Sequence, residues 1–292
     1  MNNHPEINAA LRDEIIRRNP FREQVFGIIP QGAERILDFG CHEGELLFRL
    51  ARDKACRQLY GVDIDPSIRV PLADLLDGFW NINLAAPDAD LGAEFSGFFR
   101  YIVMHDVVEH LYDPWYVCAK LRRCLAADGR LIIVTPNVQN WQILVQIVRG
   151  YFPYGAAGGI MNEDHIRWFT LQGLQEMLAL SGYSAEQLHL IFPPGAETLE
   201  KILPAGQQCL RLPPEPFRTP DMVSLEIRFP DAAEACRNYP LFLANKILAV
   251  CRPTGWAVSP EPVRPGALAG RRQRYRVQCG AGGTADGRIG IS

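Results

Sequence analysis

Residues 34–50 read ERILDFGCHEGELLFRL, and this stretch decides the fold. It begins with the apolar run RILDF, which is typical of a buried strand, and it ends in ELLFRL, where leucines recur at helical spacing. Between the two lies a turn that contains Gly40 and Gly44. A strand, a glycine turn and a helix in direct succession predict a nucleotide-type site, because backbone N–H groups at the helix start point at the ligand.

Similar alternation continues along the chain. Apolar runs predict strands at 35–39, 59–65, 79–84, 99–106, 130–137, 185–192 and 245–253. Helical spacing predicts helices within 5–28, 45–54, 66–78, 107–129 and 170–183. The segment 107–129 is expected to form two helical parts, broken near Pro114 and ended by Gly129. Strands that are apolar throughout and alternate with helices predict a doubly wound α/β domain with a mostly parallel sheet.

The expected organisation has three parts. Residues 1–30 form a helical N-terminal lid, and residues 31–252 form the main domain. Within that domain, substrate-side loops are expected at about 141–169, where aromatic residues and glycines gather, and at 193–240, a proline-rich stretch too long for a hairpin loop and interpreted as an inserted cap. Residues 253–292 lose periodicity and are expected to be a disordered tail.

Composition excludes several classes of function. The 292 residues carry 30 Lys and Arg against 33 Asp and Glu, a formal charge of −3, so no overall field attracts nucleic acid or an anionic membrane. The eight cysteines form no CxxC pair and no spacing typical of zinc ligands, which predicts reduced thiols and no bound metal. No signal peptide or membrane-length apolar run is visible, so we expect a cytoplasmic protein without stable membrane insertion.

The side chains of the glycine turn discriminate between ligands. A dinucleotide fingerprint that starts at Gly40 needs glycines at 42 and 45, where the sequence has His42 and Glu45. A phosphate-binding Walker loop lacks its lysine here as well. Asp38 stands two residues before Gly40, and a carboxylate there repels phosphates but suits a ligand that carries ammonium and sulfonium groups. S-adenosylmethionine has both groups.

Further polar residues follow the next two strands. Asp63 ends the second strand, where a carboxylate accepts hydrogen bonds from both ribose hydroxyls, and Ile64 is placed to lie against an adenine face. Beyond the third strand, Asn83 is expected to accept from the adenine amino group, while the N–H of Leu84 faces a ring nitrogen. These residues form an ordered series along one edge of the sheet.

Four stretches together resemble the class I S-adenosylmethionine-dependent methyltransferases over residues 30–185. They are ILDFGCHEGELL, YGVDIDPS, HDVVEHLYDP with LRRCLAADGRLIIVTPN, and DHIRWFTLQGLQEMLALSGY. The last two resemble the branch of ubiquinone-type O-methyltransferases and of methyltransferases that act in bacterial glycan and natural-product pathways. The resemblance implies a Rossmann-like sheet of seven strands with a final antiparallel strand. It also implies that Asp38, Gly40, Gly44 and Asp63 hold the cofactor, with Cys41 and His105 at its methionine end. His42 and Asn83 depart from the usual pattern.

The expected chemistry needs a base near the methyl group. An oxygen acceptor loses a proton, and histidine titrates close to neutrality, so His105 and His165 are the candidate catalytic histidines. Glu109 joins them by resemblance to cyclopropane fatty-acid synthases. A helical turn from residue 105 would pair His105 with Glu109, and His110 is expected to pack and hydrogen-bond beneath the loop. A metal held by His105, Glu109 and His165 stays the less favoured interpretation.

Several alternatives stay open at this point. The acceptor is expected to be a small molecule, a glycan or a lipid, methylated on oxygen; N- or C-methylation, including that of a lipid alkene, uses the same cofactor site. A regulatory protein that binds S-adenosylmethionine without turnover is a further alternative. Nucleic-acid methylation is disfavoured because no N-P-P-[YFW] motif follows the fourth strand.

Overall fold

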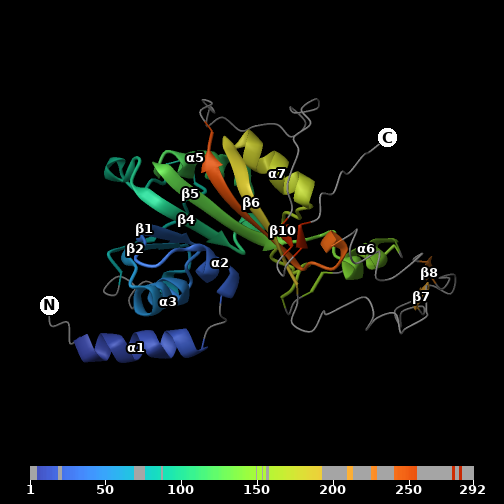
Figure 1. Ribbon diagram of the computed structural model, residues 1–292, viewed down its shortest axis with the longest axis horizontal. Coiled ribbons are helices and arrows are strands. Elements are labelled where there is room, and N and C mark those ends of the chain that lie inside the picture. Colours follow the sequence, from blue (N-terminus) through green and yellow to red (C-terminus); the bar gives the residue numbers. More distant parts are fainter. Residues whose placement is uncertain are drawn as a thin grey trace.

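The computed structural model of the chain is centred on one seven-stranded sheet, with strand order β3-β2-β1-β4-β5-β9-β6 (Figure 1). The structure describes residues 5–18, 22–68, 76–86, 88–148, 150–152, 154–155, 158–192, 209–212, 225–228, 240–254, 278–279 and 283–284. The strands of the sheet are β1 (Glu34–Phe39), β2 (Arg57–Asp63), β3 (Gly78–Asn81), β4 (Phe99–His105), β5 (Leu125–Pro136), β6 (Tyr183–Ile191) and β9 (Lys246–Pro253).

The directions of the strands confirm the predicted fold class. β1 pairs in parallel with β2 and β4, β2 with β3, and β4 with β5. β9 enters between β5 and β6 and runs antiparallel to both. The carboxyl ends of β1, β2 and β4 therefore meet at one edge of the sheet, as the predicted series of polar residues requires.

Helices cover the sheet on both sides, with α2 and α3 on one side and α5 and α7 on the other (Figure 1). The helices are α1 (Pro5–Arg18), α2 (Glu23–Ile28), α3 (Glu45–Lys54), α5 (Pro114–Arg122), α6 (Trp141–Val148) and α7 (Leu171–Leu180). Since successive strand residues face opposite sides, Ile102 and Met104 of β4 join the core beneath α5 and α7, and Val103 joins the core beneath α2 and α3. Burial on both sides explains why the strands are apolar throughout.

The two N-terminal helices form where helical spacing predicts them. Ile15 and Ile16 of α1 are buried in a small cluster with Cys41 and Phe48, so α1 packs on the outer side of α3 (Figure 1).

The helix α7 also begins where the sequence predicts it. Thr170 caps its first turn by accepting a hydrogen bond from Gly173 N at 3.0 Å.

Two predicted features of the segment 107–129 are wrong. A single 3₁₀ turn, η3 (Val108–His110), replaces the first helical part, because the next residue, Leu111, has an extended backbone with ψ of 135° and ends the turn. Gly129 does not end a helix but lies within β5, opposite an irregularity in the pairing with β4. A Cβ atom at Gly129 would stand 2.8 Å from the carbonyl oxygen of Phe99, so this glycine permits close approach of two strand backbones.

Several predictions concern residues outside the described ranges. Of the helix predicted over 66–78, the described parts are the 3₁₀ turn η1 (Pro66–Ile68) and residues 76–78, which form a bend and the first residue of β3. Of the inserted cap at 193–240, the described part is mainly the antiparallel pair of β7 (Cys209–Leu212) and β8 (Leu225–Arg228). The tail from 253 is described at 253–254 and in the short strands β10 (Gln278–Cys279) and β11 (Gly283–Thr284). Among the described helices, none has the length and apolarity that crossing a bilayer requires.

We predict that Gly61→Ala destabilises the sheet beside the glycine turn. A Cβ atom there would stand 2.8 Å from Cys41 Sγ, and such overpacking lowers the free energy of unfolding by about 1–3 kcal/mol. Urea denaturation followed by circular dichroism measures the effect. Gly27→Ala in α2 is the control, because a Cβ meets no atom within 4 Å there. Adding Cys41→Ala to Gly61→Ala should restore part of the loss, and equal stability of Gly61→Ala and wild type would contradict the packing argument.

Candidate functional site

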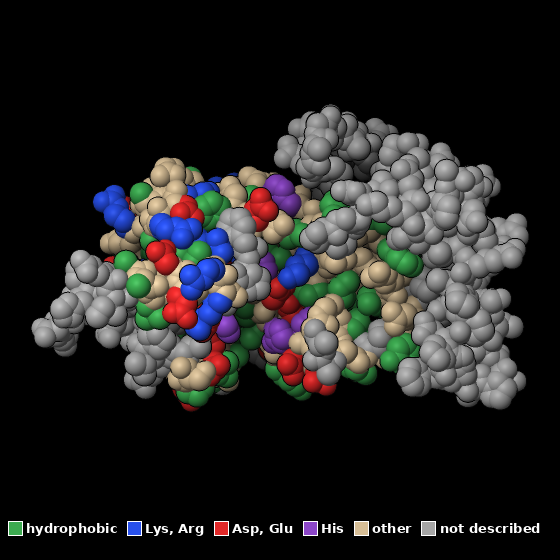
Figure 2. Space-filling model, turned by 90° about the horizontal axis from the view of Figure 1, so that it is seen from below, with side chains coloured by type: hydrophobic (Ala, Val, Ile, Leu, Met, Phe, Trp, Pro, Cys, Tyr) green, Lys and Arg blue, Asp and Glu red, His purple; other side chains and the backbone are tan. Residues whose placement is uncertain are grey.

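A cavity of about 890 Å³ opens at the carboxyl ends of β1, β2 and β4. Its volume lies within the range that holds cofactor-sized ligands. Histidine and acidic side chains gather around a hollow on this face of the molecule (Figure 2). The predicted site residues on its wall are Gly40, Cys41, Asp63, Ile64, Asn83, Leu84 and His105. The predicted residues Asp38 and Gly44 do not line it.

The glycine turn adopts backbone conformations that demand glycine. Gly40 has φ of 76°, and a Cβ atom on it would stand 2.5 Å from Val107 Cγ2. Gly44 has φ of 81° and caps the start of α3. The N–H groups of Gly40 and Cys41 both donate to Val62 O, at 2.8 and 3.1 Å, so the turn is anchored to the end of β2.

His42 occupies the turn position at which the family pattern has a glycine. Its φ of 48° is left-handed, a conformation that histidine adopts more readily than branched residues do. Its backbone N–H donates to Asp63 Oδ2 at 2.8 Å. The departure from the pattern is therefore accommodated, and the turn gains a direct link to the second acidic residue.

Asp63 is held in place by backbone groups. In addition to the bond from His42, its Oδ1 accepts from Asp65 N at 3.0 Å. A carboxylate offers about four acceptor positions, so two of them stay available for a pair of ribose hydroxyls. The neighbouring Ile64 lines the cavity with 65% of its surface exposed, as a contact for a flat apolar ring requires.

Asp38 has no exposed surface and faces the guanidinium of Arg22, with Arg22 Nη1 3.1 Å from Oδ2. Burial raises the pKa of Asp38 to about 6, although Arg22 opposes this shift. Arg22 itself lines the cavity. Of the pair, Arg22 is the residue that faces the cavity, where its guanidinium complements the carboxylate of an amino-acid moiety, while the buried charge of Asp38 behind it favours an ammonium group. Sequence inspection did not identify Arg22, since nothing local connects it to a residue 16 positions later.

A loop at residues 83–86 forms the far end of the cavity. Asn83 Oδ1 accepts from Ala85 N at 3.1 Å, which shapes the loop, and Leu84 is buried. Lys120 of α5 donates to Leu84 O at 3.2 Å and to Ala86 O at 2.9 Å. This buried lysine holds the loop and was missed from the sequence, although a charged residue in the apolar stretch VCAKL is a signal that could have found it.

His105 and the adjacent Asp106 form a hydrogen-bonded pair in the cavity wall. His105 Nδ1 lies 3.2 Å from Asp106 Oδ2, which also receives Lys246 Nζ. Burial lowers the pKa of His105 despite the neighbouring carboxylate. Burial alone would raise the pKa of Asp106, but His105 and Lys246 outweigh it and lower that pKa. The pairing of His105 with Glu109 expected from a helical turn is replaced by this contact with Asp106.

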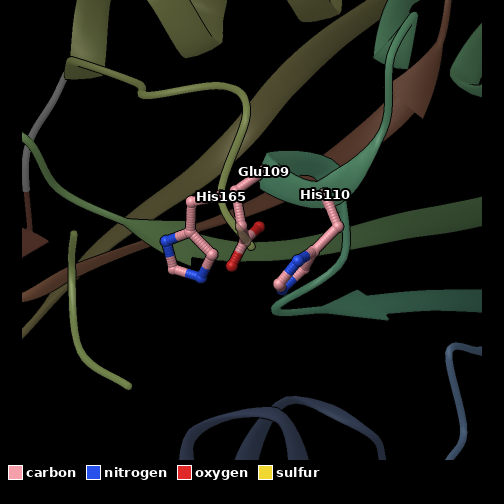
Figure 3. A group of neighbouring side chains, drawn as sticks. All are labelled: Glu109, His110 and His165. Atoms are coloured by element: carbon pink, nitrogen blue, oxygen red, sulfur yellow. The ribbon is translucent and has the colours of Figure 1, made fainter. Parts of the chain in front are cut away.

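Glu109, His110 and His165 converge beside this pair, with one potential ligand atom from each within 4.8 Å of the others. The two rings stand on either side of the Glu109 carboxylate (Figure 3). Glu109 and His165 are buried, whereas His110 is exposed and lines the cavity. His110 does hydrogen-bond the loop, as expected, but the prediction that it packs beneath the loop is wrong. His105 is not part of this group.

The aromatic segment at 141–169 contributes less to the cavity than its composition suggests. Of its described residues, Ile166 lines the cavity. Phe152 packs against Tyr154 and Trp168 with ring centroids 5.1 and 5.2 Å apart, in a cluster of its own. The role of this segment as a substrate wall stays a prediction.

A family profile described as a methyltransferase domain matches residues 8–188. The ubiquinone biosynthesis O-methyltransferases of Xanthomonas oryzae pv. oryzae strains PXO99A and MAFF 311018 are 29% identical over 122 residues, which is 41% of this chain and 50% of each relative. The chain thus spans about half the length of the curated relatives it matches.

Solved structures with a similar fold include a putative methyltransferase from Bacillus halodurans C-125. The TM-score is 0.47 at 14% identity, covering 80% of this chain and 96% of the other. A SAM-dependent methyltransferase from Archaeoglobus fulgidus gives a TM-score of 0.47 at 14% identity, covering 82% and 93%.

We predict that the affinity for S-adenosylmethionine falls at acidic pH. A cationic ligand needs ionised Asp38, whose pKa is raised to about 6, so protonation should weaken binding by about tenfold at pH 5 relative to pH 7.5. Isothermal titration calorimetry at both pH values measures this. Asp38→Asn should bind weakly at both, while Asp90→Asn, which removes a surface partner of Arg123, should behave like wild type. Equal wild-type affinity at both pH values would contradict the role of Asp38.

Proposed function

The chain belongs to the methyltransferase-domain family, its cofactor is S-adenosylmethionine, and from this premise we propose that it methylates a hydroxyl oxygen of a small-molecule, glycan or lipid-linked acceptor. The observation that carries the proposal is the pair of His105 and Asp106 on the cavity wall. An oxygen acceptor needs its proton removed, whereas the donor is already activated.

The hydrogen-bonded pair prepares His105 to act as a base. A carboxylate only accepts, so the 3.2 Å contact assigns the proton to Nδ1 and leaves the lone pair on Nε2. Burial lowers the pKa of His105 and keeps the ring neutral at pH 7. Lys246 contacts the same Oδ2 of Asp106, so a residue 140 positions away in the sequence helps to hold the carboxylate that orients the ring.

These residues account for every bond and proton of the proposed methyl transfer. When bound, S-adenosylmethionine supplies a methyl group that forms a C–O bond to the acceptor as its C–S bond breaks, with S-adenosylhomocysteine as the leaving group. His105 Nε2 takes the hydroxyl proton and passes it to solvent. The residues of the cavity wall would hold the acceptor oxygen in line with the methyl group and keep competing water away from it.

The sequence relatives support an oxygen acceptor. Their name describes O-methylation in ubiquinone biosynthesis, and the shared 122 residues amount to 41% of this chain. Which acceptor the chain uses is part of the proposal, since the match covers half of each relative.

We predict that His105→Ala lowers the rate of S-adenosylhomocysteine formation by about 10²–10⁴-fold with a hydroxyl acceptor. The screen uses phenols, sugars and lipid-linked alcohols. Activity lost in His105→Ala should recover as the pH rises, because hydroxide replaces the missing base. Asp106→Asn should lower the rate less, because it removes only the orienting partner.

His189→Ala is the matched control, since this histidine lies on β6 and pairs with Gln187 at 3.2 Å, away from the cavity wall. It should retain the wild-type rate. An unchanged rate in His105→Ala would overturn the assignment of the base and favour an acceptor that arrives without a proton to lose.

A further inference from the structure

The group of Glu109, His110 and His165 is held together by backbone as well as by side chains. Glu109 and His110 belong to η3, and His165 belongs to the loop that precedes α7. The N–H groups of Ile166 and Arg167 both donate to Glu109 O, at 2.9 and 3.0 Å. Two segments more than fifty residues apart in the sequence are thereby fixed side by side, so the convergence of the three side chains is a built feature of the fold.

Both imidazole rings are oriented by backbone carbonyl groups. His110 Nδ1 lies 3.1 Å from Asp164 O, and His165 Nδ1 lies 2.9 Å from Ile160 O. A carbonyl oxygen can only accept, so each Nδ1 carries the proton and each Nε2 keeps its lone pair. Metal-binding histidines show this arrangement, in which one ring nitrogen donates to a backbone oxygen and the other binds the ion.

The Glu109 carboxyl group has one oxygen without a partner. Thr135 Oγ1 donates to Oε2 at 3.1 Å, but Oε1 is buried and has no hydrogen-bond partner among the described residues. Only 1% of the surface of Glu109 is exposed, so water does not reach this oxygen from the cavity. An unsatisfied buried acceptor costs about 1–3 kcal/mol, and native proteins rarely retain one without a functional reason.

We propose that Glu109, His110 and His165 bind a divalent transition-metal cation of the zinc class. Two imidazole nitrogens and one carboxylate oxygen are the three-ligand set of open zinc sites, which leave a coordination position for a further ligand. Mg²⁺ and Ca²⁺ prefer oxygen ligands throughout, so the donor set disfavours them. Since His110 lines the cavity, the open position faces the same space as His105.

The geometry needs only a small contraction. Ligand atoms about 2.1 Å from a tetrahedral zinc ion stand roughly 3.4 Å apart, against the upper limit of 4.8 Å observed here. A cation also provides the partner that Glu109 Oε1 lacks, whereas a purely structural group leaves that oxygen unsatisfied.

The catalytic role of this metal site rests on the proposed function, whereas metal binding itself does not. An acceptor hydroxyl at the open position would have its pKa lowered by the cation, as water does on zinc. His105 would then take the proton from a more acidic hydroxyl. The acceptor class that fits has an oxygen able to approach both the cation and the methyl group.

Titration of the tag-free, chelator-treated full chain with ZnCl₂ tests the proposal, by calorimetry. We expect about one equivalent bound at micromolar affinity, weakened at least tenfold in Glu109→Gln and in His165→Ala. The matched controls His189→Ala and Glu176→Gln, which lie outside the group, should bind like wild type. Because Glu109→Gln conserves shape, and S-adenosylmethionine titration and thermal melting monitor its fold, loss of zinc binding with both retained identifies a ligand.

Co²⁺ gives a second readout that is independent of activity. Visible d–d bands without thiolate-to-cobalt charge transfer would exclude cysteine as the ligand and support the group. No zinc binding, or zinc binding that is unchanged in both Glu109→Gln and His165→Ala, would overturn the site. Zinc binding at the group without methylation of any hydroxyl acceptor supports the metal site and contradicts the proposed function. Methylation of a hydroxyl acceptor by a chain that binds no zinc supports the proposed function and contradicts the metal site.

Discussion

The burial of one carboxylate, Asp38, constrains the whole cofactor side of the molecule. A buried charge is costly unless a partner of opposite sign accompanies it, and Arg22 is that partner. Arg22 directly precedes α2, so this ion pair ties the start of α2 to β1. Glu45 and Asp63 lie close enough to act on Asp38 and raise its pKa further. An edge with this concentration of acidic groups favours a ligand that brings positive charge of its own.

The antiparallel strand β9 completes the site for a geometric reason. Because β9 runs against β5, it begins where β5 ends, with Lys246 opposite Pro136. Its first residue therefore reaches the edge at which the parallel strands deliver their carboxyl ends. Lys246 meets Asp106 there, 140 positions away in the sequence. A seventh parallel strand would start at the opposite edge and leave Asp106 without this cation.

Sequence patterns predicted the sheet and the acidic series well, because both depend on local features. Strands buried on two sides are apolar throughout, and Asp38 and Asp63 were found because each stands at or next to the end of such a run. The failures are those in which tertiary contacts decide. The extended backbone of Leu111 ends after one turn a helix that spacing favours, and Gly129 serves strand approach although a glycine after a helical segment ordinarily ends it. The cationic partners of Asp38 and Asp106, which are Arg22 and Lys246, could not be predicted because they come from distant segments.

Asp106 acts on both His105, the proposed base, and Glu109, a residue of the proposed metal group. It orients His105 through Nδ1, and its charge acts on Glu109. Burial, reinforced by Asp106, raises the pKa of Glu109 to about 8, so without a cation that carboxyl is predominantly protonated at neutral pH. A cation bound to Glu109 would reverse this preference and, by repulsion, would also disfavour the protonated form of His105. The proposed base and the proposed metal group would thus be coupled, and an occupied group would make His105 release its proton more readily after each methyl transfer.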